Sequence, residues 1–377
     1  MNPQSFGGPA RLHVVTEQQT TLEALGVSVA ARVPVLLWGA PGTGKTSAIR
    51  AMSNAMDWPC ETVIASIREP SDFAGLPIVS NGSVRFAPPL WAQRLSKTKN
   101  SVLFLDEIST APPAVQAALL RVVLERVVGD LTLPEGVVVI AAANPPEQSA
   151  DGWDLSAPLA NRFCHLDWSV EGRKFAQSIA AGWPAPQIPA LPKSWERQLP
   201  LARGLVSAFV GVRPILACVV PQDAAGSGRA WPSPRTWEMA ARLWAAATVA
   251  GASDDARAAL VMGSVGDGAG VEFLSWVTEM DLPDPEAVLA DPEGFELPER
   301  GDRAYAVLSA VAAAVAGEPT EKRWRAGWKV LAKAGSSAPD VAAMAARVLA
   351  QCRPPGAAAP KEIKMFAPLL RDAGLLK

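Results

Sequence analysis

Short apolar runs alternate with segments of helical spacing through the first half of the chain. These runs have the length of strands and occupy residues 33–38, 61–65, 101–105, 137–143 and 163–168. Strands that alternate with helices in this way are typical of an α/β fold with a parallel sheet. The third run is mostly apolar, as expected of a strand that is buried on both faces of such a sheet. The pattern therefore predicts a five-stranded parallel sheet.

Beyond the fifth run, the pattern becomes helical and rich in alanine. A proline-rich stretch at residues 183–200 separates the two parts and predicts a domain boundary. Residues 282–300 are rich in Pro, Asp and Glu and are expected to form an irregular connector. From the apolar spacing, helices are expected at residues 16–31, 113–128, 270–280, 302–316, 320–334, 339–349 and 361–376.

These shifts predict three parts, namely an α/β core, a linker with a helical lid, and a further C-terminal helical extension. Their expected bounds are residues 1–182, 183–250 and 251–377. Within the core, Asn81-Gly82 between two short apolar runs predicts a β-hairpin insert at about residues 73–90. An insertion on a common scaffold often carries a specific role.

Composition narrows the classes of function. The net charge over 377 residues is −2, which gives no support for a general binder of nucleic acids or membrane surfaces. The longest apolar stretch, around residues 305–316, is too short to cross a bilayer. The N-terminus has no charged-then-apolar signal pattern. We therefore expect a cytoplasmic protein that does not bind membranes.

Cysteine and histidine usage indicates neither a disulfide framework nor a zinc cluster. The four cysteines have no paired spacing, so we expect reduced thiols. They are Cys60, Cys164, Cys218 and Cys352. His13 and His165 are the only histidines, and we interpret both as structural because neither has a nearby nucleophile or metal-ligand pattern.

The first strand breaks at Gly39 into a glycine-rich loop, and Lys45-Thr46 open a helical segment. Strand, then G-x-x-x-x-G-K-[ST], then helix is the context that makes this pattern a phosphate site. Gly42 and Gly44 let backbone N–H groups curl around a phosphate, and the helix dipole adds to the attraction. Lys45 would reach the β- and γ-phosphates, and the Thr46 hydroxyl would bind Mg²⁺. The expected nucleotide-binding residues are Gly39, Ala40, Pro41, Gly42, Thr43, Gly44, Lys45 and Thr46.

The third strand ends in the acidic pair Asp106-Glu107. About 60 residues after a P-loop, such a pair indicates a Walker B motif, in which Asp106 holds Mg²⁺ and Glu107 polarises the attacking water. The alternative is an acidic pair that only caps the next helix. We favour the Walker B interpretation because the two motifs together are highly specific.

Two further polar residues flank predicted strands. Asn144 ends the fourth strand and could reach the γ-phosphate or the attacking water, or it could supply a turn before two prolines. Arg162 lies just before the fifth strand. It could be a solvated charge at a helix end, or an arginine finger inserted into a neighbour's nucleotide site. Composition does not choose between these roles.

Taken together, the motifs resemble those of the AAA+ ATPases and, within them, the MoxR group. The segments that carry the resemblance are GAPGTGKT (39–46), LDEISTAPPAVQAALL (105–120), AAANPPE (141–147), LANRF (159–163) and SPR (233–235). The predicted hairpin also looks like the insert of that group. The resemblance covers roughly residues 10–250. Two positions depart from the family pattern, since Asn161 stands where Asp is more usual and Ala143 where Gln is frequent.

The resemblance implies a P-loop NTPase fold and a division of labour between subunits. Lys45, Thr46, Asp106 and Glu107 would act on ATP and Mg²⁺ within one subunit, with Asn144 ordering the water. In the resemblance, Arg235 at the start of the lid helix corresponds to the second sensor and would contact the γ-phosphate. Its alternative is a solvated arginine in the first turn of the helix. Arg162 would act on the adjacent subunit's ATP, which implies a homo-oligomeric ring, of six subunits in the family.

The family further implies an ATP-driven chaperone that remodels a partner, commonly a von Willebrand factor A-domain protein. We expect Phe73, Leu76 and Ile78 of the hairpin to contact the substrate protein, with packing on the ring alone as the alternative. Two other functions are weighed. A nucleic-acid motor, such as a restriction or helicase-like subunit, is disfavoured by the near-neutral charge. A nucleotide-gated scaffold with low turnover is disfavoured by the presence of Glu107.

Overall fold

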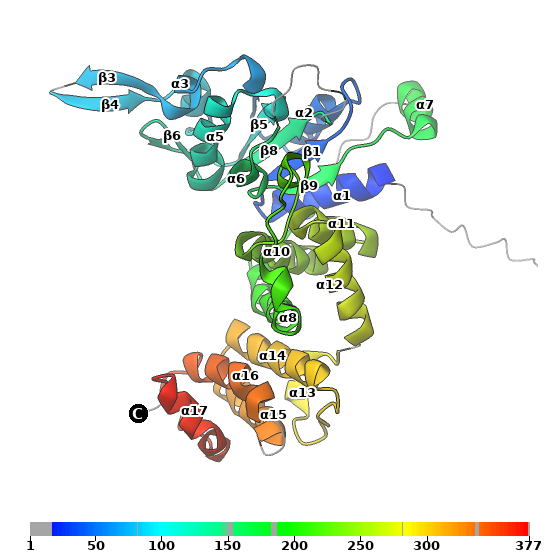
Figure 1. Cartoon of the computed structure of the whole chain (residues 1–377), viewed down its shortest axis with the longest axis vertical. Helices are drawn as coiled ribbons and strands as arrows, with labels where there is room; N and C mark the ends of the chain where they lie inside the picture. The colour runs from blue at the N-terminus through cyan, green and yellow to red at the C-terminus, as the bar shows by residue number, and fades with distance from the viewer. Residues whose placement is uncertain are drawn as a thin grey trace, which may run out of the picture.

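Five strands form one all-parallel sheet in the N-terminal half of the chain, in the order β2-β5-β8-β1-β9 (Figure 1). They are β1 (Val35–Trp38), β2 (Cys60–Ile64), β5 (Ser101–Asp106), β8 (Val137–Ala143) and β9 (Cys164–Asp167). The computed structural model describes residues 17–80, 82–145, 148, 154–181, 187–280, 282–335 and 339–375. All residues of β1 and β8 are buried, because helices cover both faces of the sheet. The predicted α/β fold with a five-stranded parallel sheet is confirmed.

The register aligns the carboxyl ends of the central strands. Trp38, the last residue of β1, lies opposite Ala143 of β8 and Asp167 of β9. On the other side of β8, β5 runs parallel and ends at Asp106. The loops that follow β1, β5 and β8 therefore leave from one edge of the sheet, the position at which open α/β sheets bind ligands.

Alternate residues of β1 enter two separate hydrophobic cores. Val35 and Leu37 join the core that contains α1 (Glu17–Ala30) and α2 (Lys45–Ala55). Leu36 and Trp38 join the core on the opposite face, which contains α5 (Pro113–Glu125). The smaller helices α3 (Ser71–Ala74), α4 (Leu90–Leu95) and α6 (Ala157–Ala160) contribute to that second core. The alternation of strand side chains thus holds both helical layers against one sheet.

The insert is a two-stranded ribbon that projects from the body of the molecule (Figure 1). Its strands β3 (Leu76–Ser80) and β4 (Ser83–Ala87) pair antiparallel, and Asn81 of the predicted turn lies outside the described residues. Phe73 is 1% exposed and packs against Trp91, with ring centroids 6.1 Å apart. The expectation that Phe73 contacts a substrate protein is therefore wrong, because this side chain belongs to the core.

A second, much shorter hairpin holds the base of this ribbon. It consists of β6 (Val127–Val128) and β7 (Leu131–Thr132). Gly75 (φ 85°) and Gly129 (φ 59°) approach so closely that a Cβ on Gly75 would lie 2.8 Å from the Cα of Gly129. Two hydrogen bonds also cross the junction. The backbone N–H of Phe86 donates to Asp130 Oδ2 at 2.9 Å, and the backbone N–H of Asp130 donates to the carbonyl oxygen of Phe86 at 3.0 Å. The two hairpins therefore meet as one rigid base.

Four helices form the next layer, below the sheet in Figure 1. They are α8 (Leu199–Val212), α10 (Pro234–Ala250), α11 (Asp254–Val265) and α12 (Asp267–Met280). Aromatic rings join α8, α10 and α12, with the Phe209 centroid 5.5 Å from that of Trp237 and 5.3 Å from that of Phe273. Helix α11 also touches the core directly, since a Cβ on Gly263 would lie 2.2 Å from the carbonyl oxygen of His165.

The C-terminal helices have a core of their own, built around the perpendicular rings of Trp324 and Trp328. They are α13 (Pro285–Ala290), α14 (Gly301–Gly317), α15 (Glu321–Gly335), α16 (Pro339–Gln351) and α17 (Ala367–Asp372). Helix α13 interrupts the predicted irregular connector. The predicted helix at 361–376 consists instead of a 3₁₀ helix, η6 (Lys361–Phe366), followed by α17. Among the described residues, every helix is too short or too polar to cross a membrane.

Among the helices that the apolar pattern missed are α11 and α7 (Gly172–Ala181). Helix α11 buries mainly small residues, so its amphipathic pattern is weak. Helix α7 has no buried residues and lies at the side of the core (Figure 1). The short helix α9 (Ala224–Ser227) lies in the loop before α10. Residues 183–186 at the start of the proline-rich linker lie outside the described residues, as do residue 182 and residues 1–16 with His13.

Candidate active site

The glycine-rich loop joins the end of β1 to the start of α2. Gly42 (φ 76°) and Gly44 (φ 88°) adopt left-handed conformations, which side chains with a Cβ rarely tolerate. Gly39 is required for a different reason, because a Cβ there would lie 2.6 Å from the carbonyl oxygen of Trp168. The Trp168 indole in turn donates to the carbonyl oxygen of Thr43 at 3.0 Å. Backbone conformation and one tryptophan thus shape the loop.

Lys45 is the first residue of α2 and its side chain folds back over the loop. Its Nζ donates to the carbonyl oxygens of Gly39 (2.5 Å) and Ala40 (3.0 Å) and to Asn144 Oδ1 (3.2 Å). The residue is only 8% exposed, and burial lowers the pKa of Lys45, while the nearby Asp106 opposes that shift. The ammonium group is therefore held in place by neutral acceptors, and a phosphate would supply the full negative charge that they lack.

Thr46 and Asp106 form an oxygen-rich pair beside this lysine. The Thr46 hydroxyl donates to Asp106 Oδ2 at 2.9 Å, and Asp106 Oδ1 accepts from the backbone N–H of Glu107 at 3.0 Å. A hydroxyl and a carboxylate are donors that suit Mg²⁺, which takes oxygen ligands and usually keeps several waters. The two residues thus fit the metal role predicted for them.

Glu107 has a left-handed backbone (φ 54°, ψ 41°), which is uncommon for a residue with a side chain and clusters at functional sites. Its Oε2 accepts a hydrogen bond from the Ser66 hydroxyl at 2.6 Å. Ser66 lies in the 3₁₀ helix η1 (Ala65–Ile67) directly after β2, the strand beside β5. Sequence reasoning missed Ser66, although a polar residue at the end of the neighbouring strand was the available signal.

Asn144 follows β8 and connects the two halves of this cluster. Its side chain faces Lys45, and its carbonyl oxygen accepts from the Ser109 hydroxyl at 3.4 Å. Ser109 lies in η2 (Ile108–Thr110), just after the acidic pair. Lys45, Thr46, Asp106 and Asn144 therefore converge at the carboxyl edge of the sheet. Pro146 and Glu147 of the AAANPPE segment lie outside the described residues.

A cavity of about 1010 Å³ adjoins the outer side of the glycine-rich loop. Helices α1, α2 and α7 enclose it, with Leu22, Ala48 and Phe175 among the apolar residues of its walls and Gln18 and Gln177 among the polar ones. Mixed apolar and amide walls beside a phosphate loop suit a nucleoside. Helix α7, which the sequence pattern did not predict, supplies one of these walls.

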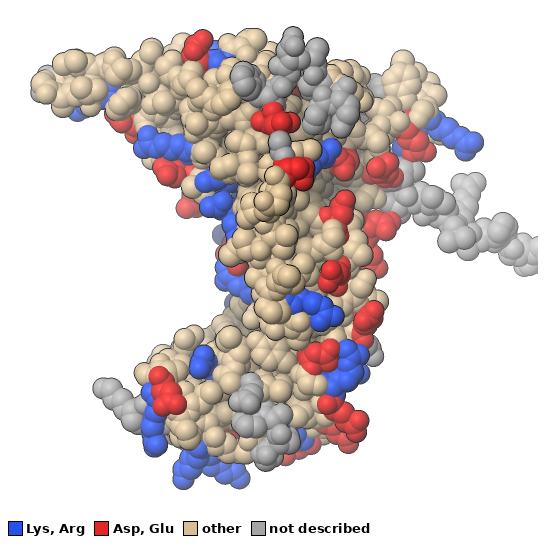
Figure 2. All heavy atoms as spheres, viewed as in Figure 1, with Lys and Arg blue, Asp and Glu red and all other residues tan. Residues whose placement is uncertain are grey.

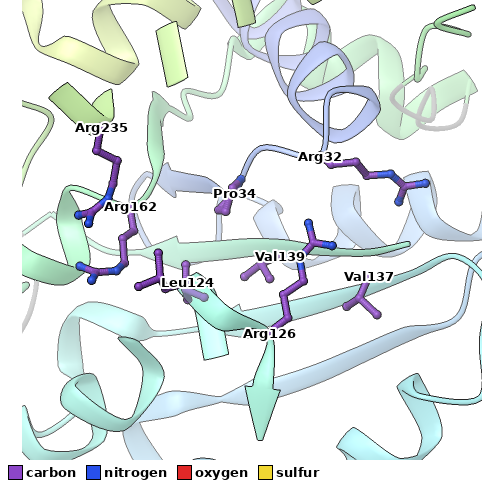
Figure 3. A pocket seen from close by; sticks show the side chains of 9 residues that line it. Arg32, Pro34, Leu124, Arg126, Val137, Val139, Arg162 and Arg235 are labelled. Carbon is purple, nitrogen blue, oxygen red and sulfur yellow. The ribbon is translucent and has the colours of Figure 1, made fainter. Parts of the chain in front are cut away.

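Arg162 and Arg235 lie at the opposite, amino-terminal edge of the sheet. They line a pocket of about 220 Å³ together with Pro34, which precedes β1, and Val137, which starts β8 (Figure 3). From Val137 to Asn144 the chain advances seven residues, about 23 Å at ~3.3 Å per residue of extended strand. Neither arginine can therefore reach the phosphate loop of its own chain.

The two guanidinium groups point toward the same region of the pocket (Figure 3). The pKa of Arg162 is lowered first by burial and then by the like charge of Arg235. The guanidinium of Arg162 donates to the carbonyl oxygen of Pro158, but its buried Nε has no partner among the described residues. Within the same residues, Arg235 forms neither a hydrogen bond nor an ion pair. Two adjacent cations without a carboxylate partner indicate an anion-binding site.

A buried polar junction holds the two arginines together. Asn161, 4% exposed, accepts from the Ser233 hydroxyl at 2.9 Å and donates to the carbonyl oxygen of Trp231 at 3.4 Å. Ser233 caps α10 and accepts from the backbone N–H of Thr236 at 3.3 Å. Because an aspartate could not donate to Trp231, the asparagine at this position fits its surroundings. No local sequence pattern indicates this contact, because it joins residues 72 positions apart.

His165 is structural, as predicted. Its Nδ1 accepts from the Trp38 indole at 2.9 Å, so Nε2 carries the proton and donates to the carbonyl oxygen of Ala160 at 2.9 Å. Burial lowers the pKa of His165 to about 4. The neutral imidazole thus connects the end of β1 to the short helix before Arg162.

Comparison with known proteins finds similarity over the part of the chain that carries these features. The AAA domain (dynein-related subfamily) matches residues 34–163, a segment that contains the glycine-rich loop, the acidic pair, Asn144 and Arg162. The protein MoxR of Paracoccus denitrificans is 37% identical over 116 residues, which are 30% of this chain and 33% of that protein. The chaperone MoxR1 of Mycobacterium tuberculosis is 27% identical over 179 residues, 46% of this chain and 43% of that protein.

A third relative has a different name. The probable regulatory protein WtsA of Pantoea stewartii is 31% identical over 125 residues, 30% of this chain and 38% of that protein. The chain thus spans 33% to 43% of the length of these three relatives. Residues 34–163 thus match an AAA domain, and the chain is similar to MoxR-type proteins over less than half of its length.

Proposed function

We propose that this protein hydrolyses ATP with Mg²⁺ as an oligomeric ring and uses the energy to remodel a partner protein. The observation that carries the proposal is the separation of the charged groups on the sheet. Lys45, Thr46, Asp106 and Glu107 lie at the carboxyl edge, whereas Arg162 and Arg235 lie at the amino edge. A head-to-tail contact between copies would bring the two edges together, and such contacts close into rings.

Within one subunit, the carboxyl edge binds and activates the nucleotide. Lys45 would bind the β- and γ-phosphates, and Thr46 and Asp106 would hold Mg²⁺, which neutralises charge as it develops on the phosphates. Asn144 is 3.2 Å from Lys45 Nζ and so lies where it can orient the attacking water. Glu107 would take up the proton of that water once its carboxylate turns from Ser66.

The adjacent subunit supplies the missing cations. Arg162 would stabilise negative charge on the transferred phosphoryl group, the role of an arginine finger. Arg235 lies beside it, so we propose that the second-sensor arginine also acts on the neighbour's ATP. Because Asn161 and Ser233 join Arg162 to the start of α10, binding of ATP at this edge would orient the lid helix as well.

The partner would be contacted by the projecting hairpin. Five large apolar side chains of β3 and β4 are exposed, Val79 by as much as 81%. They are Leu76, Ile78, Val79, Val84 and Phe86. Figure 2 shows few charged side chains over this projection. An exposed apolar ribbon is suited to a protein partner, and the family resemblance favours a von Willebrand factor A-domain protein. The free cysteines fit a cytoplasmic location.

Subunit mixing tests the proposal. Lys45→Ala and Arg162→Ala should each be nearly inactive, because one site lacks its phosphate-binding cation and the other lacks its finger. After subunit exchange, an Arg162→Ala subunit can supply an intact phosphate loop while its Lys45→Ala neighbour supplies an intact Arg162. ATP turnover should therefore recover at that interface. Mixed assembly is checked with two different affinity tags. No recovery in proven mixed assemblies would contradict action across subunits.

A nucleic-acid motor, the alternative weighed from the sequence, is the second candidate. It predicts that DNA stimulates ATP turnover and that the stimulation falls steeply with salt. ATP turnover that stays the same with and without DNA at low salt would leave the protein-remodelling proposal as the better one.

A further inference from the structure

The pocket at the amino edge of the sheet has an unusual charge. Four of its nine lining residues are arginines and none is a carboxylate. They are Arg32, Arg126, Arg162 and Arg235 (Figure 3). The remaining lining residues are apolar, with Pro34, Leu124 and Val139 lying between the two ends of the pocket. Such a lining repels cations and leaves the guanidinium groups without compensating charge.

Arg32 is explained by the fold. Its two terminal nitrogens donate to the carbonyl oxygen of Gly136 at 2.6 Å and to Asn100 Oδ1 at 2.8 Å. Its guanidinium also lies 4.9 Å from the ring centroid of Trp58. In Figure 3, the side chain points away from the other three arginines. We therefore assign Arg32 a structural role.

Arg126 is different. It follows the last turn of α5 in a left-handed conformation (φ 57°, ψ 32°), a position where glycine is the usual residue. Its side chain rises from the end of α5 into the pocket (Figure 3). Within the described residues, its one hydrogen bond is to the carbonyl oxygen of Glu135 at 2.8 Å. The neighbouring carboxylate of Glu125 is bound by Arg121 instead, at 3.2 Å.

The arrangement of the cations indicates the shape of the anion. Arg162 and Arg235 lie together at one end of the pocket, and Arg126 reaches in from the other side (Figure 3). A chain of phosphates can contact both ends, whereas a single small anion would meet only one. Guanidinium groups bind phosphate oxygens through their planar forks, which fits three arginines over one polyphosphate.

We propose that Arg126 is a third arginine that acts across the subunit interface, where it contacts the phosphate chain of the ATP held by the adjacent subunit. The proposal rests on the ring proposed above and adds to it a residue that the sequence motifs do not contain. Arg162 and Arg235 take the terminal phosphate, and Arg126 binds the chain closer to the nucleoside.

The informative variant is Arg126→Gly. Glycine suits the left-handed backbone at this position, so the variant should fold and keep or raise its melting temperature. Loss of a charged hydrogen bond to phosphate should lower kcat by about tenfold or more. Arg121→Gln on the same helix is the matched control, because Arg121 does not line the pocket and donates instead to Glu125 Oε2 at 3.2 Å and to the carbonyl oxygen of Gly129 at 3.4 Å. Its ATP turnover should stay at the wild-type value.

Subunit mixing then separates this proposal from the one on which it rests. Arg126→Gly mixed with Lys45→Ala should regain ATP turnover, and Arg126→Gly mixed with Arg162→Ala should not, because both changes lie at the same edge. If Lys45→Ala with Arg162→Ala recovers but Lys45→Ala with Arg126→Gly does not, Arg126 acts within its own subunit and the proposal is wrong. Wild-type kcat of Arg126→Gly, or loss of assembly without nucleotide, would also overturn it.

If no mixture recovers although mixed assemblies form, the ring proposal itself fails. Binding of inorganic tripolyphosphate by the Lys45→Ala protein provides a separate readout of the pocket. Arg126→Gly in that background should weaken tripolyphosphate binding by about tenfold, and Arg121→Gln should leave it unchanged. If the Lys45→Ala/Arg126→Gly and Lys45→Ala/Arg121→Gln proteins bind tripolyphosphate equally well, Arg126 does not contact phosphate.

Discussion

The two edges of the parallel sheet differ in how their charges are satisfied. At the carboxyl edge, Lys45 has three acceptors and Asp106 accepts two hydrogen bonds, all from the same chain. At the amino edge, Arg162 has a buried nitrogen without a partner in the described part of the chain, and like charges face each other. The charged groups of the first edge have partners within the chain. Under the proposed function, those of the second edge would be neutralised by the phosphates of a neighbouring subunit's ATP.

The largest expected effect tests whether Arg235 belongs to the amino edge. Arg235→Ala should lower ATP turnover by roughly 10²–10³-fold, the cost of removing one preorganised group that stabilises transition-state charge. Mixing it with Lys45→Ala should restore turnover, whereas mixing it with Arg162→Ala should not. If ATP turnover recovered with Arg162→Ala but not with Lys45→Ala, Arg235 would act within its own subunit.

A second substitution, Glu107→Gln, tests the carboxyl edge of the sheet. Glu107→Gln should lower turnover by roughly 10²-fold or more, since it removes a general base, while ATP binding persists. Because Glu107 and Lys45 act at the same edge, a mixture of Glu107→Gln and Lys45→Ala should stay inactive. The mixture of Lys45→Ala and Arg162→Ala is the active control. If the mixture of Glu107→Gln and Lys45→Ala also hydrolysed ATP, Glu107 and Lys45 would not act on the same nucleotide.

Breaking the contact between Asn161 and Ser233 should have a smaller effect. Asn161→Ala leaves the buried Ser233 hydroxyl without its acceptor and should destabilise the fold by about 1–3 kcal/mol. Loss of this contact should also lower kcat more than it changes KM, because Arg162 and Arg235 are no longer held side by side. Thermal melting and steady-state kinetics measure the two effects. Asn161→Asp, which keeps the acceptor, should be milder in both.

The last expected effect concerns stability alone, through its pH dependence, and leaves ATP turnover unaffected. The pKa of His165 is about 4 in the folded chain, below the ordinary value of 6.5, so the unfolded chain binds more protons between these values. Its contribution is therefore present above pH 6.5 and is lost as the pH falls toward 4, by at most about 3 kcal/mol. Urea unfolding at pH 7.5 and 5 measures it. His165→Gln, which does not titrate, should show a smaller difference.

Sequence motifs located the carboxyl edge because its residues are consecutive or follow strands directly. The run 39–46, the pair after β5 and Asn144 after β8 each lie in a local pattern. Since the strands are parallel, the ends of these patterns must meet. The fold class and the similarity to an AAA domain could therefore be predicted from the sequence.

The amino edge could not be predicted in the same way. Arg235 was identified by its motif, but its position beside Arg162 depends on how α10 packs against the core, which no local pattern determines. The contact of Asn161 with Ser233 and the place of Arg126 in the pocket likewise join distant segments. The expectation for Phe73 was wrong because exposure of an aromatic residue at the base of a ribbon depends on its tertiary neighbours.

The rigid base of the projecting ribbon has a mechanical consequence. Arg126 directly precedes β6, and Gly129 at the tip of that short hairpin presses against Gly75 at the root of the long one. The Phe86–Asp130 bonds clamp the same point. The pocket and the ribbon therefore share one junction of backbone contacts, so a change in the position of Arg126 is adjacent in the chain to the contacts that hold the ribbon.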